Sequence, residues 1–333
     1  MDFVSEMKAK AASSPKRLVL PEGTDERIIR TARILLDEKL AASVTLLGKI
    51  TDIQEIAVAE GVDLDGINII HPGIDTHLDK YSEEYYQLRK NKGMTLEQAK
   101  IDITESLRWG AMMVYLGDAD AIVAGALHTT GDVLRAGLSI IGTSPGIKTA
   151  SSCFVMTGMD SQYGKGGSMI FSDCAVVPDP LAEQLADITE CAAQSCREYL
   201  SADPVVALLS FSTKGSAKHD LVDKVLNTVE ILEKRNPGFA FDGELQADSA
   251  LVPSVLDKKA PGSPIRGKVN VLVFPDLNSG NISYKLVQRL GKAQAFGPFL
   301  QGFAKPISDL SRGASVDEIV ITCAVTLAKC QSA

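Results

Sequence analysis

The sequence has few of the features that identify a function class at once. Aromatic residues make up only 5% of its 333 residues, and Trp109 is the only tryptophan. We therefore expect aliphatic side chains to dominate the core, with Trp109 inside it. No apolar run approaches the roughly 18 residues that a membrane span needs. The first residues lack the basic and apolar regions of a signal peptide, which predicts no membrane partner and a cytoplasmic location.

Basic charge is also scarce. The formal net charge is −8 at pH 7, from 34 Lys and Arg against 42 Asp and Glu. Proteins that bind nucleic acid or anionic membranes need a basic surface, so we expect no nucleic-acid partner. A local basic cleft can still bind anionic small molecules, because a cleft focuses the field of its own charges.

The cysteines form no C-x-x-C pair, the spacing that is typical of metal sites and redox motifs. Most of them stand in apolar stretches. This pattern favours reduced, buried thiols in a cytosolic protein and predicts no metal site. The six residues are Cys153, Cys174, Cys191, Cys196, Cys323 and Cys330.

The remaining composition is that of an ordinary globular protein, with 45% hydrophobic and 23% charged residues. The length predicts two domains. Strand-like runs such as 17–20 and 43–48 alternate with helical patterns such as 25–40, which predicts βαβ units and mostly parallel sheets. We predict an α/β domain I over 1–145 plus 300–333, to which the last helix returns, and an α/β domain II over 146–299.

Other segments give more specific expectations. Helical patterns predict long helices over about 96–116 and 181–200, and neighbouring strands at 152–156 and 168–172. The glycine- and proline-rich segment 294–306 is expected to cross back to the first domain. The acidic residues of 242–248 resemble metal ligands of decarboxylating dehydrogenases, but acids in a surface turn are the more common case, and we interpret them so.

The stretch 309–318 combines a hydroxyl, a guanidinium and a glycine just before a helix. Ser315 and Glu318 have the Ser-x-x-Glu spacing of a capping box, and apolar residues at helical spacing follow. The start of a helix offers free backbone N–H groups to anions. Arg312 adds a two-pronged donor that suits phosphate. We predict that an anionic substrate reacts at this stretch.

Two other loops join a strand to a helix, where open α/β sheets bind ligands. The first carries Thr129 and Thr130, and Arg135 follows on its helix. His128 in the same loop is interpreted as part of the loop structure. The second is the polar loop 275–281. A basic cluster at 89–92 either binds an anion or complements the dipole of its helix.

Taken together, these segments resemble the phosphate acetyltransferase family, also called phosphotransacetylase, over essentially the whole chain. The resemblance implies reversible acetyl transfer between acetyl phosphate and coenzyme A, by direct thiolate attack in a ternary complex. It also implies two α/β domains with the active site in a cleft between them, like isocitrate and isopropylmalate dehydrogenases, and a homodimer. Coenzyme A is then a substrate, with no permanently bound cofactor. The matching segments are 20–22, 88–95, 126–137, 275–281 and 309–313.

The resemblance also implies roles for individual residues. Ser311 and Arg312 would handle the acyl phosphate, with Ser311 or backbone N–H groups stabilising the carbonyl oxygen. The family's proposed base is an aspartate seven residues after this serine. Glu318 stands there, with Asp317 beside it as the second candidate, and Glu318 equally suits a capping role. The substrate-binding residues predicted from the matching segments are Arg89, Thr129, Thr130, Arg135, Ser279, Gly280 and Asn281.

Three alternatives compete with this interpretation. Phosphate butyryltransferase shares the fold and the chemistry, and only the volume of the acyl pocket separates the two. A non-catalytic acetyl-CoA-sensing module is disfavoured by the intact 311–313 triplet. A metal- and NAD-dependent dehydrogenase is weakly disfavoured, because no dinucleotide-binding fingerprint is visible.

Overall fold

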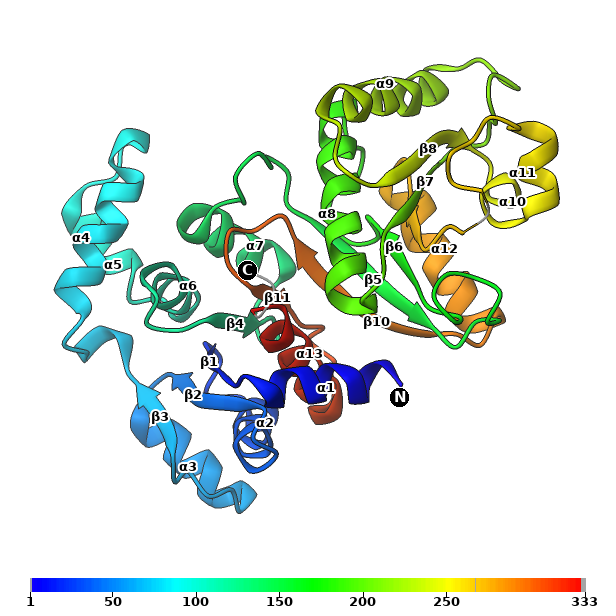
Figure 1. Cartoon of the computed structure of the whole chain (residues 1–333). Coiled ribbons are helices and arrows are strands. Elements are labelled where there is room, and N and C mark those ends of the chain that lie inside the picture. Colours follow the sequence, from blue (N-terminus) through cyan, green and yellow to red (C-terminus); the bar gives the residue numbers. More distant parts are fainter. Residues whose placement is uncertain (1, 267, 331–333) are drawn as a thin grey trace. The chain divides into compact units, whose positions relative to one another are not determined.

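Two β-sheets organise the chain in this computed structural model, which describes residues 2–266 and 268–330 (Figure 1). Each sheet belongs to its own compact unit. The first unit comprises residues 1–144 and 303–333, and the second comprises residues 145–302. The predicted fold class, α/β with mostly parallel sheets, is confirmed.

The first unit has a five-stranded sheet in the order β11-β4-β1-β2-β3, and every neighbouring pair is parallel. The C-terminal strand β11 and β4 are therefore neighbours, although about 180 residues separate them in sequence. The strands are β1 (Lys16–Leu20), β2 (Ala41–Leu47), β3 (Ile67–Ile70), β4 (Ala121–Ala124) and β11 (Ile307–Asp309).

The helices of the first unit cover this sheet. Helix α13 packs against α1 and α2, and its buried Leu327 shares a core with Leu18 and Val44 of the strands. The predicted helix over 96–116 is wrong, because the Glu105 side chain accepts from the backbone N–H groups of residues 107 and 108 and so starts a new helix. The helices are α1 (Phe3–Ser13), α2 (Glu26–Asp37), α3 (Ile50–Glu60), α4 (Leu78–Arg89), α5 (Leu96–Asp102), α6 (Ser106–Leu116), α7 (Thr130–Ala136) and α13 (Val316–Lys329).

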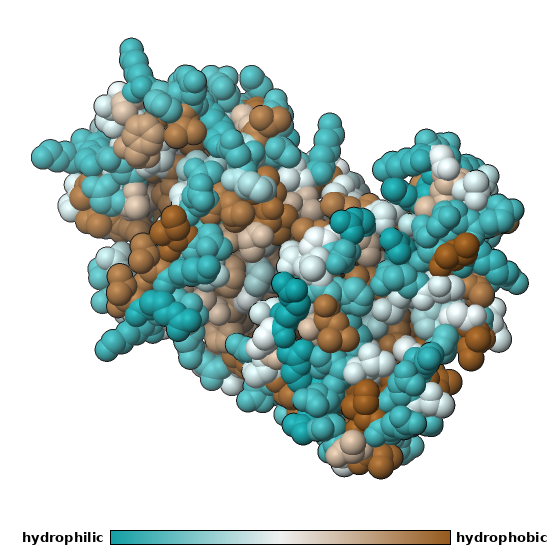
Figure 2. All heavy atoms as spheres, turned by 180° about the vertical axis from the view of Figure 1, so that it is seen from behind, coloured by the Kyte–Doolittle hydropathy of each residue, from teal (hydrophilic) through white to brown (hydrophobic). Residues whose placement is uncertain are grey.

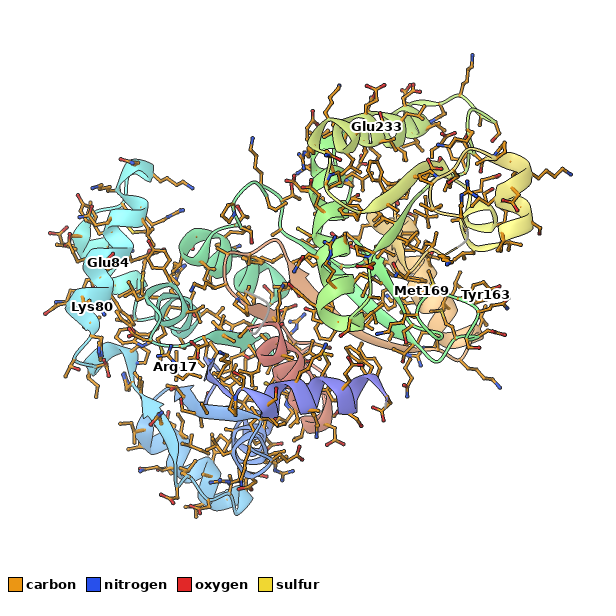
Figure 3. The ribbon with its side chains drawn as sticks, in the orientation of Figure 1. Arg17, Lys80, Glu84, Tyr163, Met169 and Glu233 are labelled. Atoms are coloured by element: carbon orange, nitrogen blue, oxygen red, sulfur yellow. The ribbon has the colours of Figure 1, made fainter. Side chains whose placement is uncertain are left out.

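The second unit has a six-stranded sheet in the order β10-β5-β6-β9-β7-β8. Strand β5 is antiparallel to both of its neighbours, and the other pairs are parallel. Met169 lies in the core of this unit, and Tyr163 packs against that core from the loop before β6 (Figure 3). The strands are β5 (Ser151–Thr157), β6 (Met169–Ser172), β7 (Val205–Leu209), β8 (Ala240–Leu245), β9 (Val271–Val273) and β10 (Gln294–Gln301).

The helices of the second unit include one that the sequence predicted well, α8 (Ala182–Leu200). The antiparallel pair β5 and β6 confirms the two neighbouring strands predicted there. Segment 294–306 passes from the second unit into the first between Gly302 and Phe303, as predicted. It also contributes an eight-residue edge strand, β10, which the glycine and proline content did not suggest. The other helices are α9 (Asp220–Arg235), α10 (Ala247–Leu251), α11 (Pro253–Lys259) and α12 (Leu277–Leu290).

The acidic segment 242–248 differs from its interpretation as a surface turn. Asp242 and Glu244 lie on β8 and are buried. Their charges have partners there: Asp242 pairs with Lys214, and Glu244 accepts from Ser212 Oγ and Gly215 N. Within residues 2–266 and 268–330, no group of three or more His, Cys, Asp and Glu side chains is placed to hold a metal ion.

The burial of individual side chains agrees with the expectations drawn from the composition. Trp109 is buried, and so are five of the six free cysteines, with Cys330 half-buried. On the face shown in Figure 2, hydrophilic side chains interrupt the hydrophobic ones. Over the described part of the chain, no helix has both the length and the apolar character for crossing a membrane.

Candidate active site

The candidate site of the first unit lies at the carboxyl ends of three adjacent parallel strands. Strand β1 ends just before Glu22, β4 leads into the loop 125–129, and β11 ends at Asp309, directly before Ser311 and Arg312. Parallel strands direct their carboxyl ends to one edge of a sheet, and open α/β sheets bind ligands there. Residues that are far apart in sequence thus converge at one edge.

Glu22 holds the loop after β4 in place. Its Oε2 accepts from the backbone N–H groups of Gly125 (2.9 Å) and Ala126 (2.8 Å), and its Oε1 accepts from those of Leu127 and His128 (2.9 Å each). Burial by itself raises the pKa of Glu22, but the hydrogen bonds from His128 and the loop outweigh it and lower the pKa. The carboxylate therefore stays ionised and fixes four consecutive backbone donors.

Gly125 makes the close approach of β4 and β11 possible. Its φ of +114° is rarely adopted by residues with a side chain. A Cβ at this position would lie 2.5 Å from Asp309 Oδ1 and 2.6 Å from Leu310 N. Only glycine lets the two strand ends come together, where the Leu310 N–H donates to Ala124 O.

Arg27, in the first turn of α2, holds the turn that carries Arg312. Its Nη1 donates to the carbonyl oxygens of Arg312 (2.9 Å) and Ala314 (2.8 Å), and its Nη2 donates to Ala126 O (3.2 Å). Asp25 pairs with the same guanidinium at 2.6 Å. One cation thus ties the 312–314 turn to the loop after β4.

Asp309 connects the end of β11 to the start of α7. Its Oδ2 accepts from Thr130 Oγ1 at 2.6 Å, while its Oδ1 is buried without a hydrogen-bond partner. Burial raises its pKa to about 6; the bond from Thr130 opposes this and the nearby Glu22 charge adds to it. The carboxyl group is thus much more easily protonated than an exposed aspartate.

Ser311 and Arg312 are exposed on a tight turn. Ser311 Oγ accepts from Gly313 N at 3.2 Å, which leaves its O–H free to donate. An ion pair with Asp309 would have given Arg312 a purely structural role, but none joins these two described residues. The turn therefore presents a hydroxyl and a guanidinium to solvent, next to the first N–H groups of α13.

Glu318 forms the predicted capping box of α13. Its Oε2 accepts from Ser315 N (2.8 Å) and Ser315 Oγ (3.0 Å), and Ser315 Oγ accepts from Glu318 N in return. Asp317 is exposed beside it. The capping role predicted for Glu318 is confirmed, while the general-base role of Glu318 or Asp317 stays a prediction.

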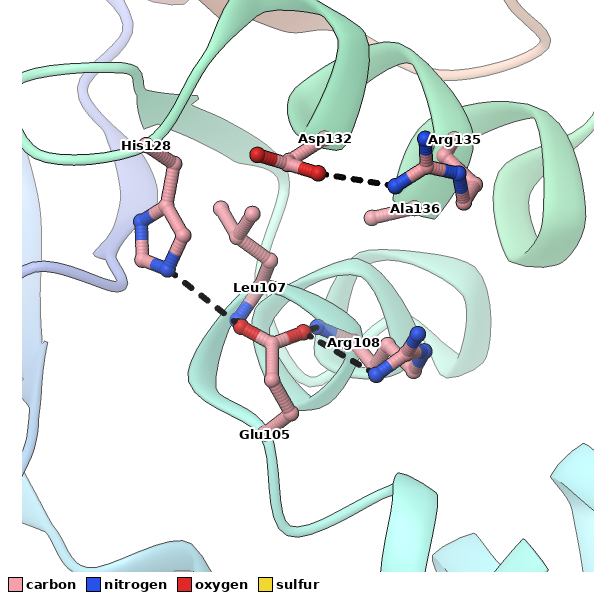
Figure 4. A pocket seen from close by; sticks show the side chains of 7 residues that line it. All are labelled: Glu105, Leu107, Arg108, His128, Asp132, Arg135 and Ala136. Atoms are coloured by element: carbon pink, nitrogen blue, oxygen red, sulfur yellow. Dashed lines mark hydrogen bonds and ion pairs between the residues drawn. The ribbon is translucent and has the colours of Figure 1, made fainter.

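A cavity of about 280 Å³ opens beside α6 and α7 (Figure 4). Arg135 lies on its wall and pairs with Asp132 at 2.7 Å, and Thr129 and Asp132 form the capping box of α7. His128 reaches the cavity from the loop after β4. The lining residues are Glu105, Leu107, Arg108, His128, Asp132, Arg135 and Ala136.

The other predicted site residues belong to α4 and α12. Arg89 is the last residue of α4, and its buried Nε has no hydrogen-bond partner. Ser279, Gly280 and Asn281 belong to the second unit, in the first turns of α12, where Asp276 caps Ser279 N and Asn281 Nδ2 donates to Cys174 O. Their part in a substrate site stays a prediction.

Sequence reasoning missed the residues that support the site. Glu22 stands in the 20–22 segment that carries the resemblance, and no pattern in the sequence singles out Arg27. Apart from Asp25, their partners named above lie between 99 and 287 residues away, so no local pattern reveals them. The one available signal was a Pro-Glu pair directly after a buried strand.

Comparisons with known proteins show the family of this chain. The family model described as "Phosphate acetyl/butaryl transferase" matches residues 2–327. The phosphate acetyltransferase of Treponema pallidum is 56% identical over 98% of each chain. A phosphotransacetylase crystal structure from Streptococcus pyogenes is 40% identical, with a TM-score of 0.93 over 99% of this chain and 98% of that one. The chain therefore belongs to the phosphate acetyl/butyryl transferase family, which confirms the resemblance.

A more distant structure shows how far the fold extends. The branched-chain phosphotransacylase of Enterococcus faecalis is 16% identical, with a TM-score of 0.66 over 95% of this chain and 99% of that one. At this identity the likeness shows the fold alone.

Proposed function

We propose that the chain catalyses the reversible transfer of an acetyl group between acetyl phosphate and coenzyme A. The observation that carries this proposal is the 56% identity, over the whole chain, with a protein named phosphate acetyltransferase. The exposed Ser311–Arg312 turn at the strand ends supports it, because it offers donors to an acyl phosphate. Coenzyme A acts as a substrate, and no tightly bound cofactor takes part.

In this mechanism both substrates bind before reaction, and the thiolate attacks the acetyl carbonyl directly. Arg312 binds the phosphate and balances its charge as the C–O bond breaks. Ser311 O–H, or an N–H group at the start of α13, donates to the carbonyl oxygen as negative charge builds there. Phosphate is a good leaving group, so the step needs no strong general acid.

The remaining predicted residues bind coenzyme A. Arg135 and Arg89 are proposed to contact its phosphates, and breaking the Arg135–Asp132 pair frees the guanidinium for this. Alanine at either arginine should raise the KM for coenzyme A and leave the KM for acetyl phosphate nearly unchanged. An unchanged KM for coenzyme A removes that residue from the site.

The proposal is tested by thioester formation from coenzyme A with acetyl phosphate or butyryl phosphate. We expect a higher kcat/KM with acetyl phosphate; the reverse preference identifies a butyryltransferase, and no transfer with either favours a sensing module. Arg312→Ala should lower kcat roughly 10²–10³-fold. Arg33→Ala, which removes a partly exposed arginine that pairs with Asp37, is the control and should leave kcat unchanged.

We further propose that the chain forms a homodimer. Helix α12 supports this, because Ile282, Leu286 and Leu290 are 55%, 51% and 79% exposed and recur every four residues along one stripe. Such a stripe is typical of an interface rather than of a free surface. Leu286→Glu should shift the mass in sedimentation to that of a monomer, whereas Val58→Glu, at a lone exposed valine on α3, should not.

A cytoplasmic location is proposed as well. The free, mostly buried thiols support it, because they are typical of a reducing compartment. Cell fractionation tests this directly, and recovery of the protein outside the cytoplasm contradicts it.

A further inference from the structure

The imidazole of His128 is held by Glu22 in one orientation. Its Nδ1 lies 2.8 Å from Glu22 Oε1. An ionised carboxylate only accepts hydrogen bonds, so Nδ1 carries the hydrogen. Nε2 is then the atom that can gain or lose a proton, as in a carboxylate–imidazole pair that serves as a base.

Nε2 is directed toward the cavity between α6 and α7. Figure 4 shows it facing Glu105, whose Oε1 lies 3.6 Å away. This distance is longer than a hydrogen bond, and the His128 side chain is 31% exposed. A substrate group can therefore reach Nε2 from the cavity. The charged groups near His128 are Glu22 after β1, Glu105 just before α6 and Asp132 on α7. Arg108 and Arg135 line the same cavity.

The loop that carries His128 also contacts the turn that carries Ser311 and Arg312. Leu310 N donates to Ala124 O at 2.7 Å, and Arg27 bridges Ala126 O to Arg312 O. At the far end of the loop, Thr130 donates to Asp309. The two segments are thus fixed to each other at the same edge of the sheet.

The proposed reaction needs a group that takes the thiol proton. The usual pKa is about 8.5 for a thiol, 6.5 for imidazole and 4.3 for a glutamate carboxyl. Transfer to imidazole is therefore unfavourable by roughly 10²-fold, against roughly 10⁴-fold for a carboxylate. The hydrogen bond with Glu22 raises the pKa of His128; burial opposes this, and the charges of Glu22, Glu105 and Asp132 add to the rise.

We propose that His128 is a catalytic residue whose Nε2 accepts the thiol proton of coenzyme A, with Glu22 as its positioning residue. This rests on the proposed acetyl transfer. The S–H bond breaks, its proton moves to Nε2, and the sulfur electron pair forms the bond to the acetyl carbon. The C–O bond to phosphate then breaks with its electron pair. The leaving phosphate takes up one proton, and His128 returns to its neutral form.

In the reverse direction the same imidazolium gives its proton to the leaving sulfur. A single group with a pKa near neutrality suits both directions, because it exchanges a proton with the thiol at little cost either way. Glu318 is the alternative acceptor, but its Oε2 already accepts two hydrogen bonds from Ser315.

The test is His128→Asn, with kcat measured at saturating substrates from pH 6 to 9. The asparagine Nδ2 can replace the Nδ1 donor to Glu22, so the loop keeps its anchor while the proton acceptor is lost. We expect kcat to fall roughly 10²–10⁴-fold and its rise with pH to disappear. His77→Asn is the matched control, because His77 makes the same 2.8 Å Nδ1 contact with Asp75 outside this site, and it should keep wild-type kcat.

Three results overturn the proposal while leaving acetyl transfer intact. The first is a His128→Asn variant with kcat within about fivefold of wild type. The second is a wild-type kcat that does not change between pH 6 and 8, which needs no variant. The third is loss of kcat in Glu318→Gln but not in His128→Asn. A wild-type protein without acetyl transfer refutes the proposed function instead.

The positioning role of Glu22 has its own readout. Glu22→Gln removes the negative charge beside the imidazole, so the pH at which kcat rises should move downward. A residue with a purely structural role would lower the amount of folded enzyme without moving that pH. An unchanged midpoint therefore rejects the positioning role.

Discussion

Glu22→Ala provides the most direct measure of how the site is held together. The Glu22 carboxylate accepts from four consecutive backbone N–H groups after β4, and its side chain is only 1% exposed. Alanine leaves all four without their acceptor. The hydrogen bonds to Gly125 and Ala126 are buried, so these two donors gain no water in exchange.

The expected cost follows from those two buried donors. An unsatisfied buried donor costs about 1–3 kcal/mol, so Glu22→Ala should lower the free energy of unfolding by about 2–6 kcal/mol. The donors of Leu127 and His128 are only partly buried and can reach water, so they add little. Since a protein of this kind is stable by about 5–15 kcal/mol, the loss should be large enough to measure easily.

Urea unfolding measures the loss, and amide hydrogen exchange locates it. Exchange at Gly125 and Ala126 should accelerate more than exchange in β2, which donates none of these four hydrogen bonds. Glu38→Ala is the control, because it removes a half-exposed glutamate whose partner is Lys8 at 2.7 Å, and should cost at most about 1 kcal/mol. A Glu22→Ala cost no larger than that of Glu38→Ala refutes this explanation of the loop.

The contribution of Glu22 to the free energy of unfolding depends on pH, and the sign of this dependence is defined. The pKa of Glu22 is lowered in the fold, so its ionisation stabilises the protein above the unfolded-state value of about 4.3. This stabilisation is lost as the pH falls through the folded-state pKa. The difference between wild type and Glu22→Gln should therefore be full at pH 7 and shrink in acid.

Two further substitutions test the packing argument by the sign of their effect. Asp309→Asn should raise the free energy of unfolding by up to about 3 kcal/mol at pH 8 and hardly at pH 4. Because the pKa of Asp309 is raised from 3.8 to about 6 in the fold, its ionisation costs stability as the pH rises through this range. Urea unfolding at the two pH values measures the difference between the variant and the wild type. Equal effects at both pH values contradict this. Gly280→Ala should lower the melting temperature, because the new Cβ would lie 2.1 Å from Asp173 O. Helix propensity alone predicts the opposite, a gain in stability of about 1 kcal/mol. A higher melting temperature would therefore contradict the clash.

Local signals were enough to predict much of the fold. The capping box of Ser315 and Glu318 predicted the start of α13, and apolar spacing predicted α8. The helix over 96–116 failed because a side-chain cap at Glu105 starts a new helix where the apolar pattern runs on. Strand β10 was not predicted for the opposite reason, because glycine and proline in an edge strand resemble the composition of a loop.

Some residues of the candidate site have a local sequence signal, and others are defined only by long-range contacts. Ser311 and Arg312 stand in a recognisable motif, and the resemblance was enough to predict them as site residues. The groups that fix their turn could not be predicted in that way. Arg27 acts through carbonyl oxygens 285 and 287 residues away, and a carbonyl oxygen has no sequence signature. Such contacts emerge only once strand order places β1, β4 and β11 side by side.

Long-range contacts also explain how the exposed turn of Ser311 and Arg312 is held in place. Ser311 and Arg312 must face solvent to meet an anionic substrate, so their own side chains cannot pack against the core. The backbone of the turn is held by a buried carboxylate and a partly buried guanidinium. The Glu22 carboxylate accepts from the N–H groups of one loop, and the Arg27 guanidinium donates to the carbonyl groups of the other. Each charge is satisfied by several fixed dipoles rather than by one mobile partner, which favours a single geometry. These contacts fix the backbone of the His128 loop relative to that of the Arg312 turn, and the proposed transfer needs both segments at one acetyl phosphate.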